Sequence, residues 1–98
     1  MALNSRQRAQ LRAMANDLQP ILQIGKGGIG ENVAEQLSLA LETRELVKGT
    51  ILETADVTAR EAADILAQAT GADIVQCIGR KFVLYKESTK HKKIELVR

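Results

Sequence analysis

The sequence is poor in the residues that support covalent, metal or membrane chemistry. Its 98 residues include one cysteine, Cys77, and one histidine, His91, which are too few for an internal disulfide or a zinc site within one chain. No apolar run approaches the roughly 20 residues of a membrane span, and arginines interrupt the first apolar positions, where a secretory signal needs a continuous run. We therefore expect a cytoplasmic protein without a metal, a cofactor or a membrane segment.

Aromatic and catalytic side chains are equally scarce. The chain has one phenylalanine, one tyrosine and no tryptophan, so a surface that stacks successive bases on aromatic rings, as RRM sheets do, is not predicted. His91 lies in a polar stretch with no nucleophile beside it, and Cys77 lies in an apolar run typical of a buried strand. These features predict a protein that is not an enzyme.

Positive charge is concentrated near the C-terminus. The length suits one compact domain, residues 1–98. Although the net charge is only +2, seven basic side chains stand against two acidic ones from Arg80 onward, whereas acidic groups are in excess before it. This asymmetry predicts a surface that faces a polyanion, with nucleic acid favoured over a membrane. Residues 87–93 read as a basic arm that we expect to be mobile.

Apolar periodicity predicts the element order α-β-α-β-α-β-β. Helices are expected over residues 3–18, 31–43 and 58–70, the first capped by Ser5, and strands over residues 21–24, 45–52, 73–78 and 81–86. The first two strands should pair in parallel across a helical crossover, and the last two should form a hairpin through Gly79 and Arg80. We predict an α/β protein, a two-layer sandwich with a four-stranded mixed sheet.

The expected core follows the inward stripes of these elements: Leu11, Leu18, Ile24, Val33, Leu37, Leu41, Val47, Ile51, Ile65, Leu66, Val75 and Val83. Gly49, inside a strand, predicts a bulge or the close approach of another backbone. Residues 94–97 suit either an edge strand or a segment docked on the body, and the sequence leaves both open.

A glycine-rich loop links the first strand to the second helix. Residues 25–30 read Gly-Lys-Gly-Gly-Ile-Gly. Glycines let backbone N–H groups converge, and the unpaired N–H groups of the following helix point into the same space, so the loop predicts an anion site suited to phosphate. Its first four residues form a G-x-x-G pattern, which in other proteins clamps a nucleic-acid backbone.

The predicted RNA-binding residues combine this loop with the basic groups that follow the third helix: Gly25, Lys26, Gly27, Gly28, Arg80, Lys81, Lys90, Lys92 and Lys93. Arg80 and Lys81 are expected at the tip of the hairpin, and the arm lysines should extend the same surface. Structured RNA, recognised through its backbone and shape, is the expected partner, with no small-molecule substrate.

Two other functions stay open. Gly25, Gly27 and Gly30 match the G-x-G-x-x-G fingerprint of dinucleotide-binding proteins, with Glu53 or Asp56 as ribose ligand, although the chain is too short for two βαβ halves. A small nucleotide-binding protein is therefore one alternative. The other is a protein-interaction module whose basic arm docks on an acidic partner.

Three blocks of sequence resemble one known family and together cover nearly the whole chain. They are residues 8–29, which include Leu-Gln-Pro-Ile-Leu-Gln-Ile-Gly-Lys-Gly-Gly-Ile, residues 45–48 (Glu-Leu-Val-Lys) and residues 78–86 (Ile-Gly-Arg-Lys-Phe-Val-Leu-Tyr-Lys). They resemble the bacterial YhbY family of stand-alone CRM domains, named for chloroplast RNA splicing and ribosome maturation. Gly30 departs from the pattern, since a serine or threonine helix cap is expected there.

The resemblance implies a fold similar to the C-terminal domain of bacterial translation initiation factor three, with the G-x-x-G loop at the RNA surface. It also implies association with ribosomal RNA in precursors of the large subunit, as a factor in ribosome assembly. We expect the protein to act as a monomer.

Overall fold

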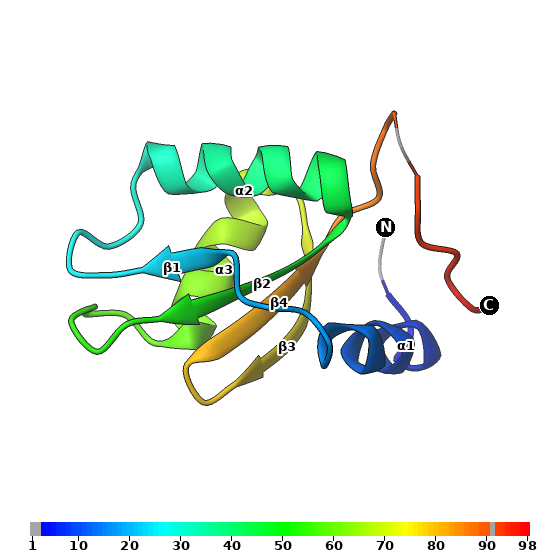
Figure 1. Cartoon of the computed structure of the whole chain (residues 1–98), viewed down its shortest axis with the longest axis horizontal. Helices are drawn as coiled ribbons and strands as arrows, with labels where there is room; N and C mark the ends of the chain where they lie inside the picture. The colour runs from blue at the N-terminus through cyan, green and yellow to red at the C-terminus, as the bar shows by residue number, and fades with distance from the viewer. Residues whose placement is uncertain (1–2, 91) are drawn as a thin grey trace.

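Figure 1 shows a computed structural model of the chain, which describes residues 3–90 and 92–98. The elements are α1 (Ser5–Ala15), β1 (Leu22–Ile24), α2 (Glu31–Arg44), β2 (Leu46–Ile51), α3 (Ala59–Thr70), β3 (Asp73–Ile78) and β4 (Lys81–Tyr85). The strands form one sheet in the order β1-β2-β4-β3, in which β1 and β2 are parallel and the other pairs antiparallel. The predicted α/β class, element order, parallel pair and hairpin are confirmed.

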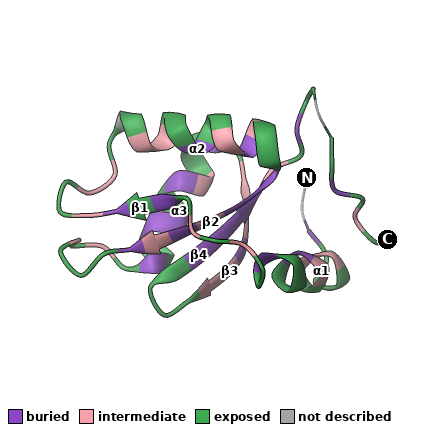
Figure 2. Ribbon diagram, in the orientation of Figure 1, coloured by how far each residue is buried: buried purple, intermediate pink, exposed green. Residues whose placement is uncertain are grey.

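Helices cover both faces of the sheet. The larger apolar cluster joins α2 and α3 to one face, and the smaller cluster joins α1 to the other. Strand β4 contributes to both, because side chains alternate along a strand: Phe82 and Leu84 belong to the larger cluster, and Val83 and Tyr85 to the smaller. The sandwich of the sheet with α2 and α3 therefore gains a partial third layer from α1 (Figure 2).

The helix ends follow their capping residues. At α3, Thr58 and Glu61 form the predicted capping box, and Gly71 ends the helix with a φ of 79°. The first helix is shorter than predicted. Its cap is Asn4 rather than Ser5, because the Asn4 side chain accepts the Gln7 N–H and the Gln7 side chain accepts the Asn4 N–H, which completes a second capping box.

Gly49 makes room for an aromatic ring rather than for another backbone. It pairs with Phe82 across β2 and β4, and a Cβ at position 49 would clash with the Phe82 ring. The described strand carries no bulge at this point, so the predicted bulge or close backbone is wrong. Gly49 leaves room for the one phenylalanine of the chain to fill the larger core, where Phe82 is 1% exposed.

The predicted core is correct except at a few positions. Ile65 is exposed, because the buried stripe of α3 consists of Ala59, Ala62, Ala63, Leu66 and Thr70. Leu18 and Val33 are only half-buried. Small alanines let α3 lie close to the sheet, where the large side chains come from β4, and the sequence pattern favoured the larger isoleucine instead.

The C-terminal residues dock on the body and add no strand within the described part of the chain. Ile94 is buried in the smaller cluster. Gln10 of α1 holds the backbone beyond it, since its Nε2 donates to the Glu95 carbonyl at 2.7 Å and its Oε1 accepts the Val97 N–H at 2.8 Å. This settles the alternative that the sequence left open.

Candidate nucleic-acid interface

The glycine loop begins as a tight turn at the end of β1. Ile24 is fully buried, and the Gly28 N–H donates to the Gly25 carbonyl at 3.0 Å, which closes the turn. Gly28 has a φ of 71°, a left-handed conformation that costs other residues free energy. The turn itself therefore requires glycine at position 28.

The fold does not require Gly27 or Gly30. Neither has a positive φ, and a Cβ added at either position would meet no atom within 4 Å. The backbone at these positions is thus open to the close approach of another molecule. Lys26 lies beside them, exposed at the tip of the loop.

Backbone donors gather in this loop without acceptors from the chain. In the described residues, the N–H groups of Lys26, Gly27 and Ile29 have no hydrogen-bond partner. Gly30 is the N-cap of α2 and supplies no side-chain cap, although its carbonyl accepts from Val33 and Ala34. The positive end of the α2 dipole adds to these donors, so the loop favours an anion physically as well as by pattern.

The loop between β2 and α3 and the hairpin tip lie at the same end of the sheet as the glycine loop (Figure 1). The Leu52 N–H donates to the Ile24 carbonyl at 2.8 Å, and the Ile51 N–H donates to the Arg80 carbonyl at 2.7 Å. Gly79 has the expected positive φ, 58°. The structure therefore brings the glycine loop, Arg80 and Lys81 together at one end, which we call the loop end.

Cations at the loop end differ in how they are paired. Arg80 Nη1 lies 3.3 Å from Glu53 Oε1, an exposed ion pair that the sequence did not predict. Lys26 and Lys81, both exposed, have no side-chain partner in residues 3–90 and 92–98. By contrast, Lys48 and Lys86 donate to the carbonyls of Ala15 and Thr70 at the C-terminal ends of α1 and α3, so these two lysines stabilise helix ends.

The basic arm, of which the structure describes residues 87–90 and 92–93, lies at the opposite end of the molecule (Figure 1). It leaves the sheet after β4 and runs beside the C-terminal end of α2, a helix about 20 Å long from its 14 residues. Lys90, Lys92 and Lys93 are exposed there, and Lys92 Nζ lies 3.5 Å from Glu87 Oε1. The arm lysines do not extend the surface of Lys26 and Arg80, so that part of the prediction is wrong.

Two carboxylates fix the path of this arm, which the sequence predicted to be mobile. Glu45 is fully buried; its Oε1 accepts the N–H groups of Lys93 and Ile94, and its Oε2 accepts that of Ser88, each at 2.7 Å. Glu42 Oε1 accepts from the backbone of Thr89 and Lys90. We call this the carboxylate end.

The pKa values at the carboxylate end follow from these contacts. Burial opposes the charged form of Glu45, but the N–H groups of Ser88, Lys93 and Ile94 outweigh it and lower its pKa below 4.5. Hydrogen bonds, led by the Thr89 hydroxyl, lower the pKa of Glu42. The sequence held a signal for both, because acids at the C-terminal end of a helix oppose its dipole and need another partner.

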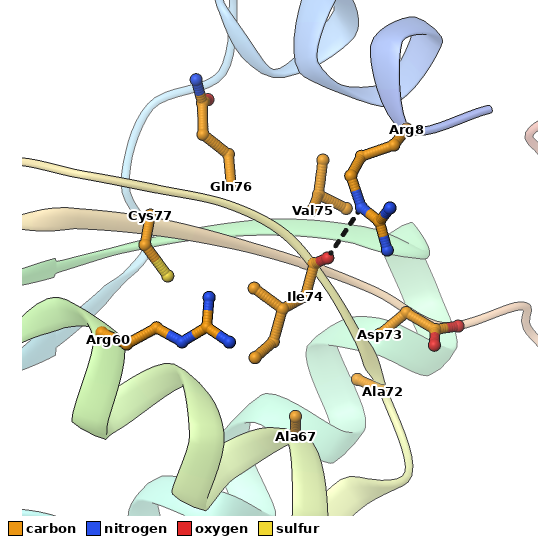
Figure 3. A pocket seen from close by; sticks show the side chains of 9 residues that line it. All are labelled: Arg8, Arg60, Ala67, Ala72, Asp73, Ile74, Val75, Gln76 and Cys77. Carbon is orange, nitrogen blue, oxygen red and sulfur yellow. Dashed lines mark hydrogen bonds between the residues drawn. The ribbon is translucent and has the colours of Figure 1, made fainter. Parts of the chain in front are cut away.

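A hollow of about 440 Å³ lies along the edge strand β3 (Figure 3). Arg8 of α1 reaches it from one side and donates to the Ile74 carbonyl at 3.4 Å, while Arg60 of α3 lies on the other side near Cys77. The register shift between Ile74 and Gln76 bends the strand, and together with Arg8 it protects this edge from pairing. Burial raises the pKa of the Cys77 thiol, which makes it less reactive.

The described residues give no support to a metal site, a membrane span or a dinucleotide site. In the described residues no group of three metal-ligating side chains could hold an ion. None of the helices described is long and apolar enough to cross a membrane. Only β1, α2 and β2 form a parallel βαβ unit in this part of the chain, and Glu53, the suggested ribose ligand, is paired with Arg80. His91 lies outside the described residues, so its role stays a prediction.

The fold and the glycine loop define an α/β domain with open backbone donors at one end, and the sequence comparisons identify its family. The CRS1/YhbY (CRM) domain model matches residues 3–86. The chain is 42% identical over 94 residues to the Bacillus subtilis protein named "Probable RNA-binding protein YqeI", covering 96% of this chain and 98% of that one. The chain belongs to the CRS1/YhbY (CRM) domain family.

Other relatives agree with this assignment. The Pseudomonas aeruginosa protein named "Probable RNA-binding protein PA4753" is 30% identical over 93 residues, which cover 95% of this chain and 89% of that one. The solution structure of SAV1595 from Staphylococcus aureus, described as a candidate RNA-binding protein, has a TM-score of 0.80 and 43% identity, and the match covers 98% of this chain and all of SAV1595.

Proposed function

We propose that this chain is a non-catalytic RNA-binding protein that binds RNA at the loop end. The observation that carries the proposal is the glycine loop itself, with N–H groups of Lys26, Gly27 and Ile29 that have no acceptor in the described part of the chain. Phosphate oxygens are the acceptors that such donors and a helix N-terminus favour. The names of YqeI and PA4753 support RNA as the source of those phosphates.

The resemblance to bacterial CRM domains extends the proposal to a partner and a process. The RNA is ribosomal RNA of large-subunit precursors, and the protein assists ribosome assembly in the cytoplasm as a monomer. The arm lysines form a second, separate basic surface at the carboxylate end and make a smaller contribution. Crosslinking in cells followed by sequencing of the bound RNA tests the partner: reads spread over messenger RNA rather than ribosomal RNA would contradict it.

Salt dependence tests the mode of binding. If the loop end makes about five phosphate contacts, the logarithm of the affinity should fall with the logarithm of the salt concentration at a slope between about −3.5 and −4.5, the values for single strands and for a duplex. The measurement is a fluorescence-anisotropy titration with a structured ribosomal RNA fragment at several salt concentrations. A flat response would contradict binding through phosphates.

A ligand screen separates this function from the nucleotide-binding alternative. NAD or ATP at a hundred times its dissociation constant would stabilise the fold by about 2.7 kcal/mol, a shift that thermal denaturation detects. We expect no such shift with either compound. A clear shift without salt-dependent RNA binding would favour the alternative.

A further inference from the structure

A small hollow opens at the loop end between the hairpin tip and the loop that joins β2 to α3. Its volume is about 240 Å³, and its lining includes Leu52, Ala55 and Val57 from that loop and Arg80 from the tip. This is below the roughly 300 to 1,000 Å³ of pockets that take drug-sized ligands, so it suits one small ring system.

The hollow adjoins the glycine loop. Leu52 lines it, and Leu52 Cδ1 lies 3.4 Å from the place where a Cβ at Gly25 would stand. Leu52 is also 40% exposed, so it leaves apolar surface at the mouth of the hollow. A nucleic-acid backbone on the glycine loop would bring its bases beside this mouth.

The walls of the hollow suit a base ring. Ala55 and Val57 pack partly on the larger core and give an apolar wall. Arg80 gives a planar guanidinium, on which bases stack in other RNA-binding proteins, so no aromatic ring is needed. Both features accept any base and confer no selectivity by themselves.

Glu53 is the anionic acceptor in the lining of this hollow. Its carboxylate lies at the rim, 83% exposed and 3.3 Å from Arg80. An ionised carboxylate only accepts hydrogen bonds, and its two oxygens match two adjacent donors. On its Watson–Crick edge guanine presents two adjacent donors, N1–H and the N2 amino group, whereas adenine, cytosine and uracil have no two adjacent donors on that edge.

We propose that this hollow binds a guanine base of the RNA, stacked on Arg80 and bonded through N1–H and N2–H to Glu53. The proposal rests on the RNA-binding function above, and it adds a single base-reading site to a loop that contacts phosphates alone. It also gives a role to the Arg80–Glu53 pair, because Arg80 holds the carboxylate at the rim when no base is bound.

Nuclear magnetic resonance titration of the whole protein tests the site with GMP, AMP, IMP and inorganic phosphate. We expect GMP to shift the amides of residues 52–58 and of Gly79 and Arg80 with an affinity about tenfold higher than that of AMP. IMP, which lacks the N2 amino group, should fall between them. Phosphate alone should shift only the glycine loop.

A matched pair of variants sharpens the titration. Glu53→Gln should remove the difference between GMP and AMP, because an amide no longer offers two acceptors. Glu87→Gln changes an exposed, ion-paired glutamate at the carboxylate end and should keep the difference. Equal responses to all nucleotides, shifts reproduced by phosphate, or an unchanged preference in Glu53→Gln would each overturn the guanine site.

Failure of this site and failure of the RNA-binding function give different results. If the protein binds RNA in a salt-dependent way but GMP does not shift the amides of residues 52–58, the guanine site alone is overturned. Guanine-selective shifts in a protein without RNA affinity would support the base site and overturn the RNA-binding function.

Discussion

The two ends of the sheet treat backbone N–H groups in opposite ways. At the carboxylate end, Glu45 and Glu42 accept the N–H groups of the basic arm, so the chain satisfies its own donors. At the loop end, Lys26, Gly27 and Ile29 present N–H groups for which the described chain has no acceptor. The two ends therefore differ in their open backbone donors, and this difference does not follow the density of positive charge. The arm is the more basic segment, yet its backbone is already occupied.

The largest effect is expected from breaking the carboxylate end. Glu45→Gln places an amide donor among the N–H groups of Ser88, Lys93 and Ile94 and leaves them without a carboxylate, which should cost about 3 kcal/mol of unfolding free energy. Urea denaturation measures this loss. Glu87→Gln is the control, since its exposed ion pair with Lys92 contributes little. Equal stability of the two variants would show that Glu45 does not hold the arm.

Acid should weaken the same end to a smaller extent. The folded pKa values of Glu45 and Glu42 lie below 4.5, so the stability they contribute is present above pH 4.5 and is lost as the pH falls through the folded values. The loss should be smaller than in Glu45→Gln, because the hydroxyl oxygen of a protonated carboxyl can still accept a hydrogen bond, whereas the amide nitrogen of glutamine only donates. The protection of the Ser88 and Ile94 amides against hydrogen exchange, relative to the intrinsic rate at each pH, should fall below pH 4.5. Unchanged protection there would contradict this account.

Gly28 and Gly27 allow the effect of a glycine on stability to be measured separately from its effect on RNA binding. Gly28→Ala forces a side chain into a φ of 71° and should cost about 1 kcal/mol of stability. Gly27→Ala meets no atom within 4 Å and should leave the stability unchanged. Its RNA affinity should nevertheless fall, because the new methyl group blocks a close backbone approach. A Gly27→Ala protein that binds RNA at full strength would remove the close approach from the account.

The smallest effect concerns the start of α2. Gly30→Ser supplies the side-chain cap that the helix lacks and should raise the stability by a few tenths of a kcal/mol, since glycine is a tolerable cap. Thermal denaturation measures the gain. A loss of stability would mean that the backbone at Gly30 cannot take the geometry of a serine cap.

The fold could be predicted from the sequence because its signals are local. Pro20, the capping box at Thr58 and the glycines at 71 and 79 mark where elements begin and end, and the structure confirms these boundaries to within a few residues, except that α1 ends at Ala15. Partnerships between distant residues left no such signal. The ring of Phe82 over Gly49 needs the register of β2 and β4, which no periodicity reveals.

The candidate site likewise has a part that local sequence signals predict and a part that depends on contacts between distant residues. The glycine loop was visible as a motif, and its neighbourhood with Arg80 followed from the expected hairpin. The path of the arm could not be predicted from the sequence, because it depends on Glu45, which lies 43 residues before Ser88 in the chain. The prediction that the arm extends the surface of the glycine loop rested on charge composition alone. In the structure, Glu42 and Glu45 hold the arm at the other end of the sheet.

A charge-matched comparison of RNA affinity tests the central claim most directly. Lys26→Glu with Arg80→Glu changes the loop end, and Lys90→Glu with Lys93→Glu changes the arm by the same net charge, so long-range electrostatics cancel between the two proteins. We expect the first variant to lose at least tenfold in affinity for many RNAs alike, and the second to lose about threefold or less. Equal losses, or a larger loss for the arm variant, would contradict the claim that the loop end grips the RNA backbone.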